Sequence, residues 1–466
     1  MYMLRWIAIL GGVLVMMGQH SRSESLFYYF RLEDQVPEHH LLRLIERHVS
    51  FDFVRTALKD SYSETGRPSI DPEVLLRILL IGYLYGVTSE RKLIEELRMH
   101  LAWRWFTGLG FDQEIPHHST FSKNRHGRFE ESNLFQQLFE EIVGRCMKAG
   151  LVKGEHLSVD GSFIQANASN ASRVPREQLQ EAAQVNHTVR EYLSELEKEN
   201  GSGEPPTHQQ DGVSTTDPDA TYASKGCMAA SLGYFDNYLV DNHSCVIADV
   251  QTTAARLSQE SVAARDMITR FTERRGSPPQ TLAADTTYGN GEMLDWLEQH
   301  SITGHIPVKE CPLGKSGLYS VEQFTYRQEN NSYMCPEGKQ LTYVGINPRN
   351  RTHLYASTPK RCRDCSQKAQ CTRGKTRILQ IHIHEGARQR ARERAKTPEF
   401  DIALRARKKV EALFAELKNQ IGLRRLRLRR MKFVREQFFL AAAAQNLKRL
   451  VRFLARTTPP PLQVTA

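Results

Sequence analysis

The middle of the chain alternates between patterns typical of a strand, a helix and a second strand, and this alternation constrains the fold most. Residues 280–285 form a short apolar run that predicts a buried strand, and residues 302–309 predict another. The residues between them, 289–300, predict a helix. Such alternation is typical of a sheet layer covered by helices. The sequence therefore predicts an α/β unit at the centre of the chain.

The residues before this unit predict further strands. Residues 155–164 alternate between apolar and polar side chains after an amphipathic helix at 135–149. Residues 233–240 and 244–251 predict two more strands, which the turn Asp241-Asn-His243 joins into a hairpin.

Composition divides the rest of the chain. A helical pattern dominates residues 41–110, whereas residues 173–219 are polar and include the breaker run Gly201-Ser-Gly-Glu-Pro-Pro206. Short β-like pieces follow one another from 311 to 385. We expect this division: an N-terminal extension at 1–24, a helical domain at 25–130, an α/β core at 131–310 and 386–456 with a surface insertion at 173–219, a β-rich insertion at 311–385, and a disordered tail at 457–466.

Positive charge is concentrated near the C-terminus. The chain has 63 Lys and Arg against 53 Asp and Glu, a formal net charge of +10. Residues 385–456 hold 21 Lys and Arg against 7 Asp and Glu, a larger excess than the whole chain carries. Such a stretch suits a polyanion, and a solvated helix face has the same composition.

The cysteines and the apolar N-terminus do not indicate a secreted or membrane protein. The 8 cysteines do not resemble a disulfide framework. The apolar run at 6–17 is shorter than the ~20 residues that a membrane span needs, and no small-residue cleavage site follows it. It is either a signal peptide or the product of a start codon assigned too far upstream, with Met17 as the true start. We expect a cytoplasmic protein without membrane contact.

Two aspartates stand at or near the ends of predicted strands, in Asp160-Gly-Ser and Asp285-Thr-Thr-Tyr-Gly-Asn. A carboxylate there is held rigidly and still faces solvent. Two Mg²⁺ ions about 3.5–4 Å apart can activate a nucleophile and stabilise the leaving oxygen in phosphodiester chemistry, and Mg²⁺ prefers hard oxygen ligands. A lone aspartate at a strand end is more often a cap or a turn former. The pair is therefore a candidate metal site only if both aspartates act together.

A third acid lies on the helix predicted at 401–421. The apolar stripe of this helix comprises Val410, Leu413, Phe414, Leu417 and Ile421. Arg407, Glu411 and Lys418 line one edge of the stripe, whereas Glu416 projects away from that edge. Glu399 is expected to precede the helix. An acid between two basic residues suits metal binding beside DNA phosphates, and a row of surface salt bridges gives the same pattern.

Six motifs lie between residues 26 and 290. They are Leu26-Phe-Tyr-Tyr-Phe-Arg-Leu-Glu-Asp34, Gly66-Arg-Pro-Ser-Ile-Asp-Pro72, Arg104-Trp-Phe-Thr-Gly-Leu-Gly110, His118-Ser-Thr-Phe-Ser-Lys-Asn-Arg125, Ser158-Val-Asp-Gly-Ser-Phe-Ile164 and Ala284-Asp-Thr-Thr-Tyr-Gly-Asn290. Together they resemble insertion-sequence transposases of the DDE type, in particular the eleven-eighty-two group. In such transposases the Glu of an Asp, Asp, Glu triad lies in a Tyr-x2-Arg-x3-Glu-x6-Lys helix. Arg407, Glu411 and Lys418 match that spacing, and Leu404 stands in place of the Tyr.

The resemblance implies an α/β, RNase H-like catalytic core with a helical N-terminal domain and an inserted β-rich block. It implies that Asp160, Asp285 and Glu411 bind Mg²⁺ or Mn²⁺, and that Arg407 and Lys418 contact DNA. The implied reaction is cleavage at the 3′ ends of an insertion sequence, followed by joining to target DNA. The N-terminal part is expected to recognise the terminal inverted repeats, with a homodimer in the DNA complex. The alternatives are a nuclease that cuts without joining and a DNA-binding repressor left from an inactivated element.

Four cysteines of the β-rich block form a candidate zinc site. Cys335, Cys362, Cys365 and Cys371 provide one CxxC pair and two outlying thiols, enough for tetrahedral coordination by four thiolates. Four reduced cysteines without metal fit the same pattern.

A basic segment, Arg424-Arg-Leu-Arg-Leu-Arg-Arg430, follows the helix that carries Glu411. Its leucines can pack while its arginines face water. Because the segment follows the expected active site, we expect Arg424, Arg425 and Arg427 to bind DNA phosphates.

Overall fold

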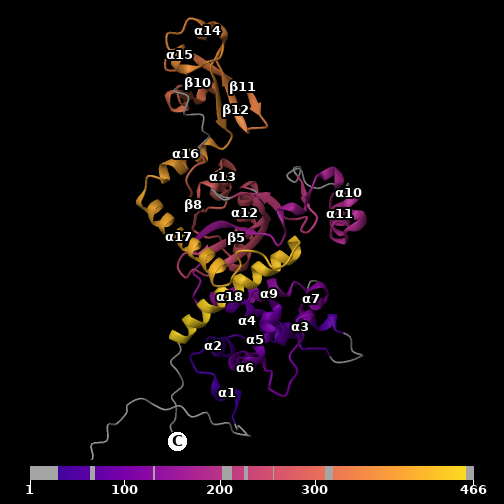
Figure 1. Cartoon of the computed structure of the whole chain (residues 1–466). Helices are drawn as coiled ribbons and strands as arrows, with labels where there is room; N and C mark the ends of the chain where they lie inside the picture. The colour runs from indigo at the N-terminus through magenta and orange to yellow at the C-terminus, as the bar shows by residue number, and fades with distance from the viewer. Residues whose placement is uncertain are drawn as a thin grey trace, which may run out of the picture.

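The computed structural model describes residues 30–62, 69–129, 132–201, 212–224, 229–255, 257–309 and 318–457 (Figure 1). Several sequence predictions lie outside these residues: the apolar run at 6–17, most of the breaker run at 201–206, Cys227, Cys311 and the tail from Pro459. Among the helices of the described ranges, none has the length and apolar character needed to cross a membrane.

The centre of the molecule is a mixed six-stranded sheet. Its strands are β1 (His156–Gln165), β4 (Thr221–Ala223), β5 (Ser231–Asp241), β6 (Ile247–Ala254), β7 (Thr281–Ala283) and β8 (Thr303–His305). Strand β5 is antiparallel to β1, β4 and β6, whereas β7 is parallel to β1 and β8 is parallel to β7. The order β6-β5-β1-β7-β8, antiparallel on one side of β1 and parallel on the other, is that of an RNase H-like core. The predicted fold class is therefore confirmed.

Long helices cover both faces of this sheet: α12 (Leu257–Arg275), α17 (Pro398–Asn419) and α18 (Met431–Thr457). Successive side chains of a strand point to opposite faces, so β1 contributes to two cores. Leu157 and Val159 lie in the core beneath α12. On the other face, Tyr238 of β5 stacks on Phe414 of α17, with ring centroids 4.6 Å apart. The Tyr238 hydroxyl donates a hydrogen bond of 3.1 Å to Gln445 of α18.

The N-terminal part is helical, as predicted. Its elements are α1 (Leu32–Gln35), α2 (Leu41–His48), α3 (Phe53–Leu58), η1 (Lys59–Ser61), α4 (Pro72–Leu84), α5 (Glu90–Met99), α6 (Leu101–Thr107), α7 (Ser119–Asn124) and η2 (Arg125–Phe129), followed by α9 (Leu134–Lys148). Figure 1 shows α18 between these helices and the sheet layer, and α18 packs against α2, α4 and α9. The fully buried small side chains at 441–444, all Ala, let the helices approach closely. The N-terminal helices therefore share one hydrophobic core with the C-terminal helices, instead of having a separate core.

The predicted surface insertion at 173–219 contains a packed unit of its own. It comprises β2 (Arg173–Val174), η4 (Arg176–Gln178), α10 (Leu179–Val185), α11 (His187–Asn200) and β3 (Val213–Ser214), with η3 (Asn170–Ser172) just before it. Tyr192 and Leu193 belong to its small core. Arg430, buried and with a left-handed backbone (φ 71°), joins this unit to the start of α18 through ion pairs to Asp219 (2.8 Å) and Glu195 (2.5 Å).

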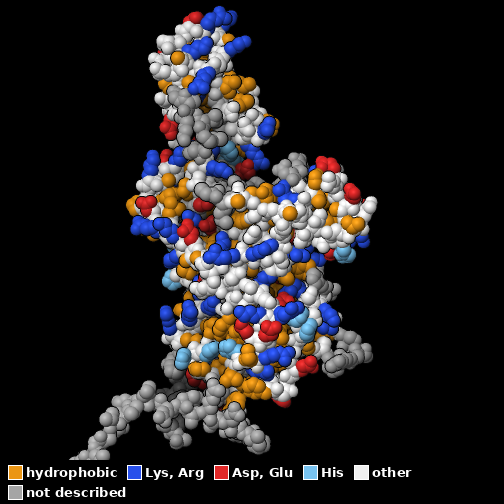
Figure 2. Space-filling model, viewed as in Figure 1, with side chains coloured by type: hydrophobic (Ala, Val, Ile, Leu, Met, Phe, Trp, Pro, Cys, Tyr) orange, Lys and Arg blue, Asp and Glu red, His pale blue; other side chains and the backbone are white. Residues whose placement is uncertain are grey.

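The predicted β-rich insertion is an antiparallel five-stranded sheet that projects from the body (Figure 1). Its elements are η8 (Val321–Gln323), β9 (Thr325–Arg327), η9 (Gln328–Asn330), β10 (Ser332–Met334), β11 (Gln340–Asn347), β12 (Thr352–Ala356), α14 (Pro359–Arg363), α15 (Lys368–Cys371) and β13 (Ile378–His382). Figure 2 shows Lys and Arg side chains at the tip of this block. Its connection to α17 is α16 (Glu385–Arg394), which packs on α13 (Gly291–Gln299) and places Arg390 2.5 Å from Glu298.

Asp217 gives the fold a testable pH dependence. Its carboxylate is fully buried and accepts hydrogen bonds from the Tyr234 hydroxyl (2.7 Å) and the Arg430 backbone N–H (2.9 Å). Burial, the largest cause, raises the pKa of Asp217 to about 6. Because the folded protein favours the protonated acid, this contribution to stability is present at low pH and is lost as the pH rises from about 4 to about 6.

Asp217→Asn should therefore gain stability relative to the wild type between pH 4 and 7, by at most about 3 kcal/mol, and the difference should level off above pH 7. Urea unfolding of both proteins across this range measures the difference. A pH-independent difference would contradict a raised pKa at this position.

Candidate active site

Asp160 lies in the middle of β1, as the strand predicted at 155–164 implies, and not at a strand end. It faces Tyr238 across the antiparallel pair with β5. On the other side, the parallel pairing of β1 with β7 ends at Ser158 and Ala283. No residue of β7 pairs beside Asp160, because β7 ends at Ala283, whereas β1 continues to Gln165.

Asp285 follows two residues after the end of β7. Asp285 is two residues beyond Ala283, as Asp160 is two residues beyond its strand partner Ser158. Asp285 also caps the short helix η6 (Thr286–Tyr288), since its Oδ1 accepts the Thr287 N–H at 2.8 Å. This hydrogen bond fixes the Asp285 side chain, so Asp285 can cap η6 and also serve as a rigid acidic ligand.

Helix α17 brings the third predicted acid to the same place. The residues of its predicted apolar stripe are all buried. One guanidinium nitrogen of Arg407 lies 3.0 Å from Asp160, and another lies 3.2 Å from Glu411. The Asp160 side chain is 13% exposed, whereas that of Glu411 is 58% exposed. Arg407 thus joins the nearly buried carboxylate of Asp160 on the sheet to the exposed carboxylate of Glu411 on the helix.

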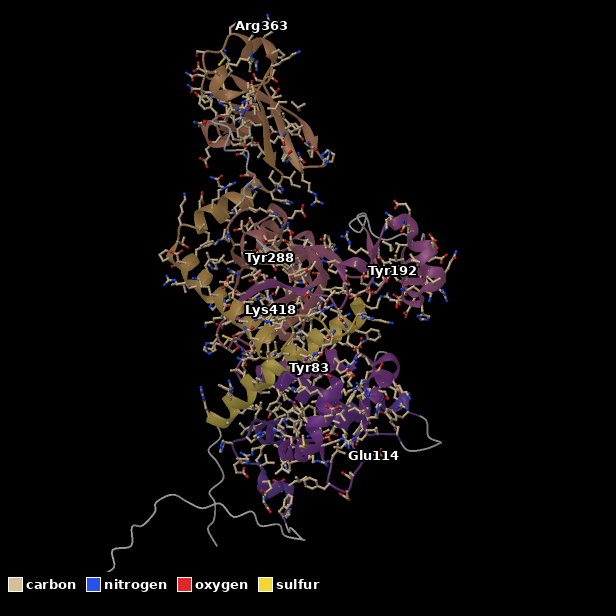
Figure 3. The ribbon with its side chains drawn as sticks, in the orientation of Figure 1. Tyr83, Glu114, Tyr192, Tyr288, Arg363 and Lys418 are labelled. Atoms are coloured by element: carbon tan, nitrogen blue, oxygen red, sulfur yellow. The ribbon has the colours of Figure 1, made fainter. Side chains whose placement is uncertain are left out.

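The hydroxyl of Tyr288 lies near Asp160, Asp285 and a further acid, Glu260. Its ring is fully buried, and burial is the main reason that the pKa of its hydroxyl lies far above the usual value. The negative charges of Glu260, Asp160 and Asp285 raise this pKa further. Figure 3 places Tyr288 in the sheet layer. The sequence did not single out Glu260, whose position in the first turn of α12 looks like an ordinary complement to the helix dipole.

The donor set fits a hard divalent cation, because it consists of carboxylate oxygens. The Arg407 guanidinium between Asp160 and Glu411 shows that this position favours positive charge. As the side chains stand, no three His, Cys, Asp or Glu residues of the described chain are close enough together to hold a metal ion. Binding would therefore require Arg407 to leave and Glu411 to turn inward.

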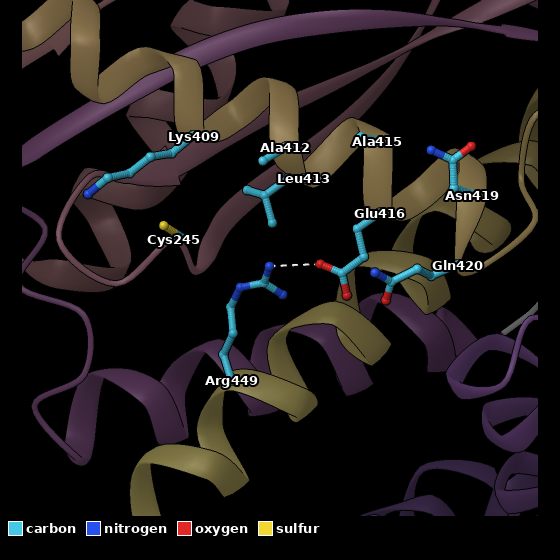
Figure 4. Close-up of a pocket in the computed structure, with 9 residues that line it drawn as sticks. All are labelled: Cys245, Lys409, Ala412, Leu413, Ala415, Glu416, Asn419, Gln420 and Arg449. Atoms are coloured by element: carbon cyan, nitrogen blue, oxygen red, sulfur yellow. Dashed lines mark hydrogen bonds and ion pairs between the residues drawn. The ribbon is translucent and has the colours of Figure 1, made fainter.

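Glu416 points to the other side of α17, as the helical spacing predicts. Its carboxylate lies 2.8 Å from Arg449 and 3.7 Å from Lys448, both on α18. Figure 4 shows the Arg449 contact beside an open pocket of about 390 Å³. Glu399 lies inside the first turn of α17 and not before it, because Pro398 takes the first helical position.

Lys418 lies in the last turn of α17 (Figure 3). Its charge acts on Asp236 of β5, which is fully buried. Burial raises the pKa of Asp236 well above the usual value, and Lys418 acts in the opposite direction. Lys418 therefore compensates a buried acid of the sheet as well as extending the basic edge of the helix.

The basic segment pairs beside the end of β1, although the two are far apart in the sequence. The Leu426 N–H donates to the Gln165 carbonyl at 2.8 Å. Arg424 and Arg425 are exposed, whereas the guanidinium of Arg427 lies over the Tyr83 ring, 4.5 Å from its centroid. Arg427 thus helps to join the C-terminal segment to the N-terminal helices.

The four cysteines of the β-rich block lie at one end of its sheet, and all four are free thiols. Burial raises the pKa of Cys371, and the nearby thiols of Cys362, Cys335 and Cys365 raise it further. The Sγ of Cys335 accepts the Lys339 N–H at 3.3 Å.

Two parts of the chain match known families. Residues 30–127 match the family described as "Transposase domain (DUF772)", and residues 334–451 match the family described as "Transposase DDE domain". The second match includes Glu411 and the four cysteines, whereas Asp160 and Asp285 precede it. No curated protein matches the chain.

A solved structure, the piggyBac transposase synaptic complex with hairpin DNA, is 11% identical, with a match over 91% of this chain and 82% of that one and a TM-score of 0.35. So low a score does not bear on the fold or the activity of this chain.

The two acids of α17 should differ in their effect on stability. Glu416→Gln leaves the nearly buried Lys448 without its acidic partner and should lower the free energy of unfolding by about 1–3 kcal/mol. Glu411→Gln removes an exposed pair and should change it by less than about 1 kcal/mol. Chemical denaturation without divalent metal measures both values, and the reverse ranking would contradict the orientation of the helix.

Proposed function

We propose that the chain, a transposase with a DDE domain that acts on DNA, cleaves at the 3′ ends of an insertion sequence and joins those ends to target DNA. The observation that supports this reaction most is the Arg407 guanidinium, which joins Asp160 of the sheet to Glu411 of α17. Asp285 follows the end of β7, the strand beside β1, and its charge and that of Asp160 act on the same buried Tyr288 hydroxyl. As part of the proposal, we assign the chain to the eleven-eighty-two group on the basis of its six motifs.

Asp160, Asp285 and Glu411 would hold Mg²⁺ or Mn²⁺. Such ions activate the attacking oxygen and stabilise the leaving oxygen, first when water cuts the strand and then when the 3′-OH attacks the target. Asp160 is held by its strand and Asp285 by its cap, so both are already oriented. Glu411 is exposed and can adjust its side chain, and Arg407, once released from the two carboxylates, can bind a DNA phosphate.

Arg424 and Arg425 would extend the DNA contact away from the acids. Gln165, which pairs with Arg425, lies five residues after Asp160, or about 16 Å along the strand. A duplex that reaches both places would span about five base pairs at 3.4 Å per base pair. The N-terminal helices would recognise the terminal inverted repeats, and the complex would contain two copies of the chain.

Asp160→Asn and Asp285→Asn should each reduce cleavage by about 100-fold or more while leaving binding to end-repeat DNA nearly unchanged, because these carboxylates bind metal rather than phosphate. Purified protein, radiolabelled end DNA, a target plasmid and Mg²⁺ provide the assay. Joined products from the wild type support a transposase, cuts without joining indicate a nuclease, and mobility shifts without cuts indicate a repressor.

Glu411→Gln should lose cleavage and Glu416→Gln should keep most of it in the same assay, since Glu411 shares Arg407 with Asp160 and Glu416 faces α18. Circular dichroism checks the folding of both variants. Activity in Glu411→Gln together with inactivity in folded Glu416→Gln would rule out Glu411 as the third acid.

We also propose that Cys335, Cys362, Cys365 and Cys371 bind a structural zinc ion. The cysteines around Cys371 provide, once deprotonated, the sulfur donors that zinc prefers, and the Lys339 N–H would stabilise the Cys335 thiolate. The ion would fix α14 and α15 to strand β10.

Purified protein should contain about one zinc per chain, and Cys365→Ser should lose it and become sensitive to protease within the β-rich block. Cys245→Ser, at a free cysteine outside the block, is the control and should keep both zinc and resistance. Metal analysis by mass spectrometry that finds no zinc in protein produced with zinc available would contradict the site.

A further inference from the structure

Glu260 lies against the strand that carries Asp160. It is in the first turn of α12 and is only 3% exposed. A methyl group at Gly161 would lie 2.7 Å from the Glu260 Oε1 and 2.6 Å from the Asn237 Oδ1. The residue after Asp160 must therefore lack a side chain for the Glu260 carboxylate to occupy this position.

Tyr288 links Glu260 to the predicted acids. Its hydroxyl is fully buried and makes no hydrogen bond within the part of the chain that the structure describes. The charges of Glu260, Asp160 and Asp285 all act on this hydroxyl. The Tyr288 hydroxyl is thus a buried donor without an acceptor among the described residues, near three carboxylates. A bound group that draws these acids together would give it one.

The end of β7 explains how an acid beneath the sheet can reach the site. Asp160 and Gly161 point to opposite faces of β1, so Glu260 approaches from the α12 face and Arg407 from the α17 face. Beyond Ala283 no residue of β7 pairs with β1. Glu260, Asp160 and Asp285 can meet beyond this end of β7.

We propose that Glu260 is a fourth acidic residue of the catalytic centre and binds the same divalent cation as Asp160 and Asp285. Tyr288 is a positioning residue, whose hydroxyl donates a hydrogen bond to one of these carboxylates when the cation brings them together. The inference rests on the proposed function, because it requires a divalent cation at Asp160.

Mn²⁺ binding to the full chain without DNA tests the proposal apart from catalysis. Mn²⁺ affinity is measured by isothermal titration and by the electron paramagnetic resonance of free Mn²⁺. Glu260→Gln should weaken binding by about tenfold or more, as the loss of an acidic ligand or its immediate support does in metal sites. Glu273→Gln, at an exposed acid of the same helix, is the matched control and should bind like the wild type. Tyr288→Phe should weaken binding less than Glu260→Gln.

Asp160→Asn separates the two levels of the proposal. If the wild type binds Mn²⁺ and Asp160→Asn does not, the measured site is the proposed one, and wild-type affinity in folded Glu260→Gln would overturn the role of Glu260 alone. If Asp160→Asn binds like the wild type, the proposed metal site itself fails, and the inference fails with it. Should Glu260→Gln not fold, Glu260→Asp takes its place: it keeps the charge but shortens the side chain, so reduced affinity supports the proposal and unchanged affinity overturns it.

Discussion

The early end of β7 governs the geometry of the acidic centre. Pairing between β1 and β7 stops at Ser158 and Ala283, whereas β1 continues to Gln165 and keeps its antiparallel partner β5. Asp160 therefore has the rigidity of a central strand, although no residue of β7 pairs beside it.

The C-terminal helices complete this centre from a distant part of the sequence. The chain leaves the sheet after β8, forms the β-rich block, and returns through α16 to α17, so that Asp285 and Glu411 are separated by a whole folded unit. The return is fixed by ion pairs between α16 and α13 and by the packing of Phe414 on Tyr238. The N-terminal helices, α17 and α18 all contribute to one hydrophobic core.

The sequence predicted what depends on local pattern. Strand and helix periodicity predicted the sheet layer. The helical spacing of α17 predicted that Glu411 and Glu416 point in different directions. Features that depend on chain packing were not predictable. The end of β7 beside Asp160 depends on pairing between distant segments, the stacking of Arg427 on Tyr83 joins residues far apart in sequence, and Lys418 acts on a buried acid that the pattern of β5 did not reveal. Glu260 was missed because a helix-start glutamate is ordinary, and the nearest signal was the glycine after Asp160.

The convergence of the three acids is tested most directly by anomalous X-ray scattering from crystals of the protein soaked in Mn²⁺. Asp160, Asp285 and Glu411 should all contact Mn²⁺, with Arg407 turned away from both of its present partners. Saturating Mn²⁺ that binds elsewhere, while Arg407 still bridges Asp160 and Glu411, would contradict a catalytic centre at this place.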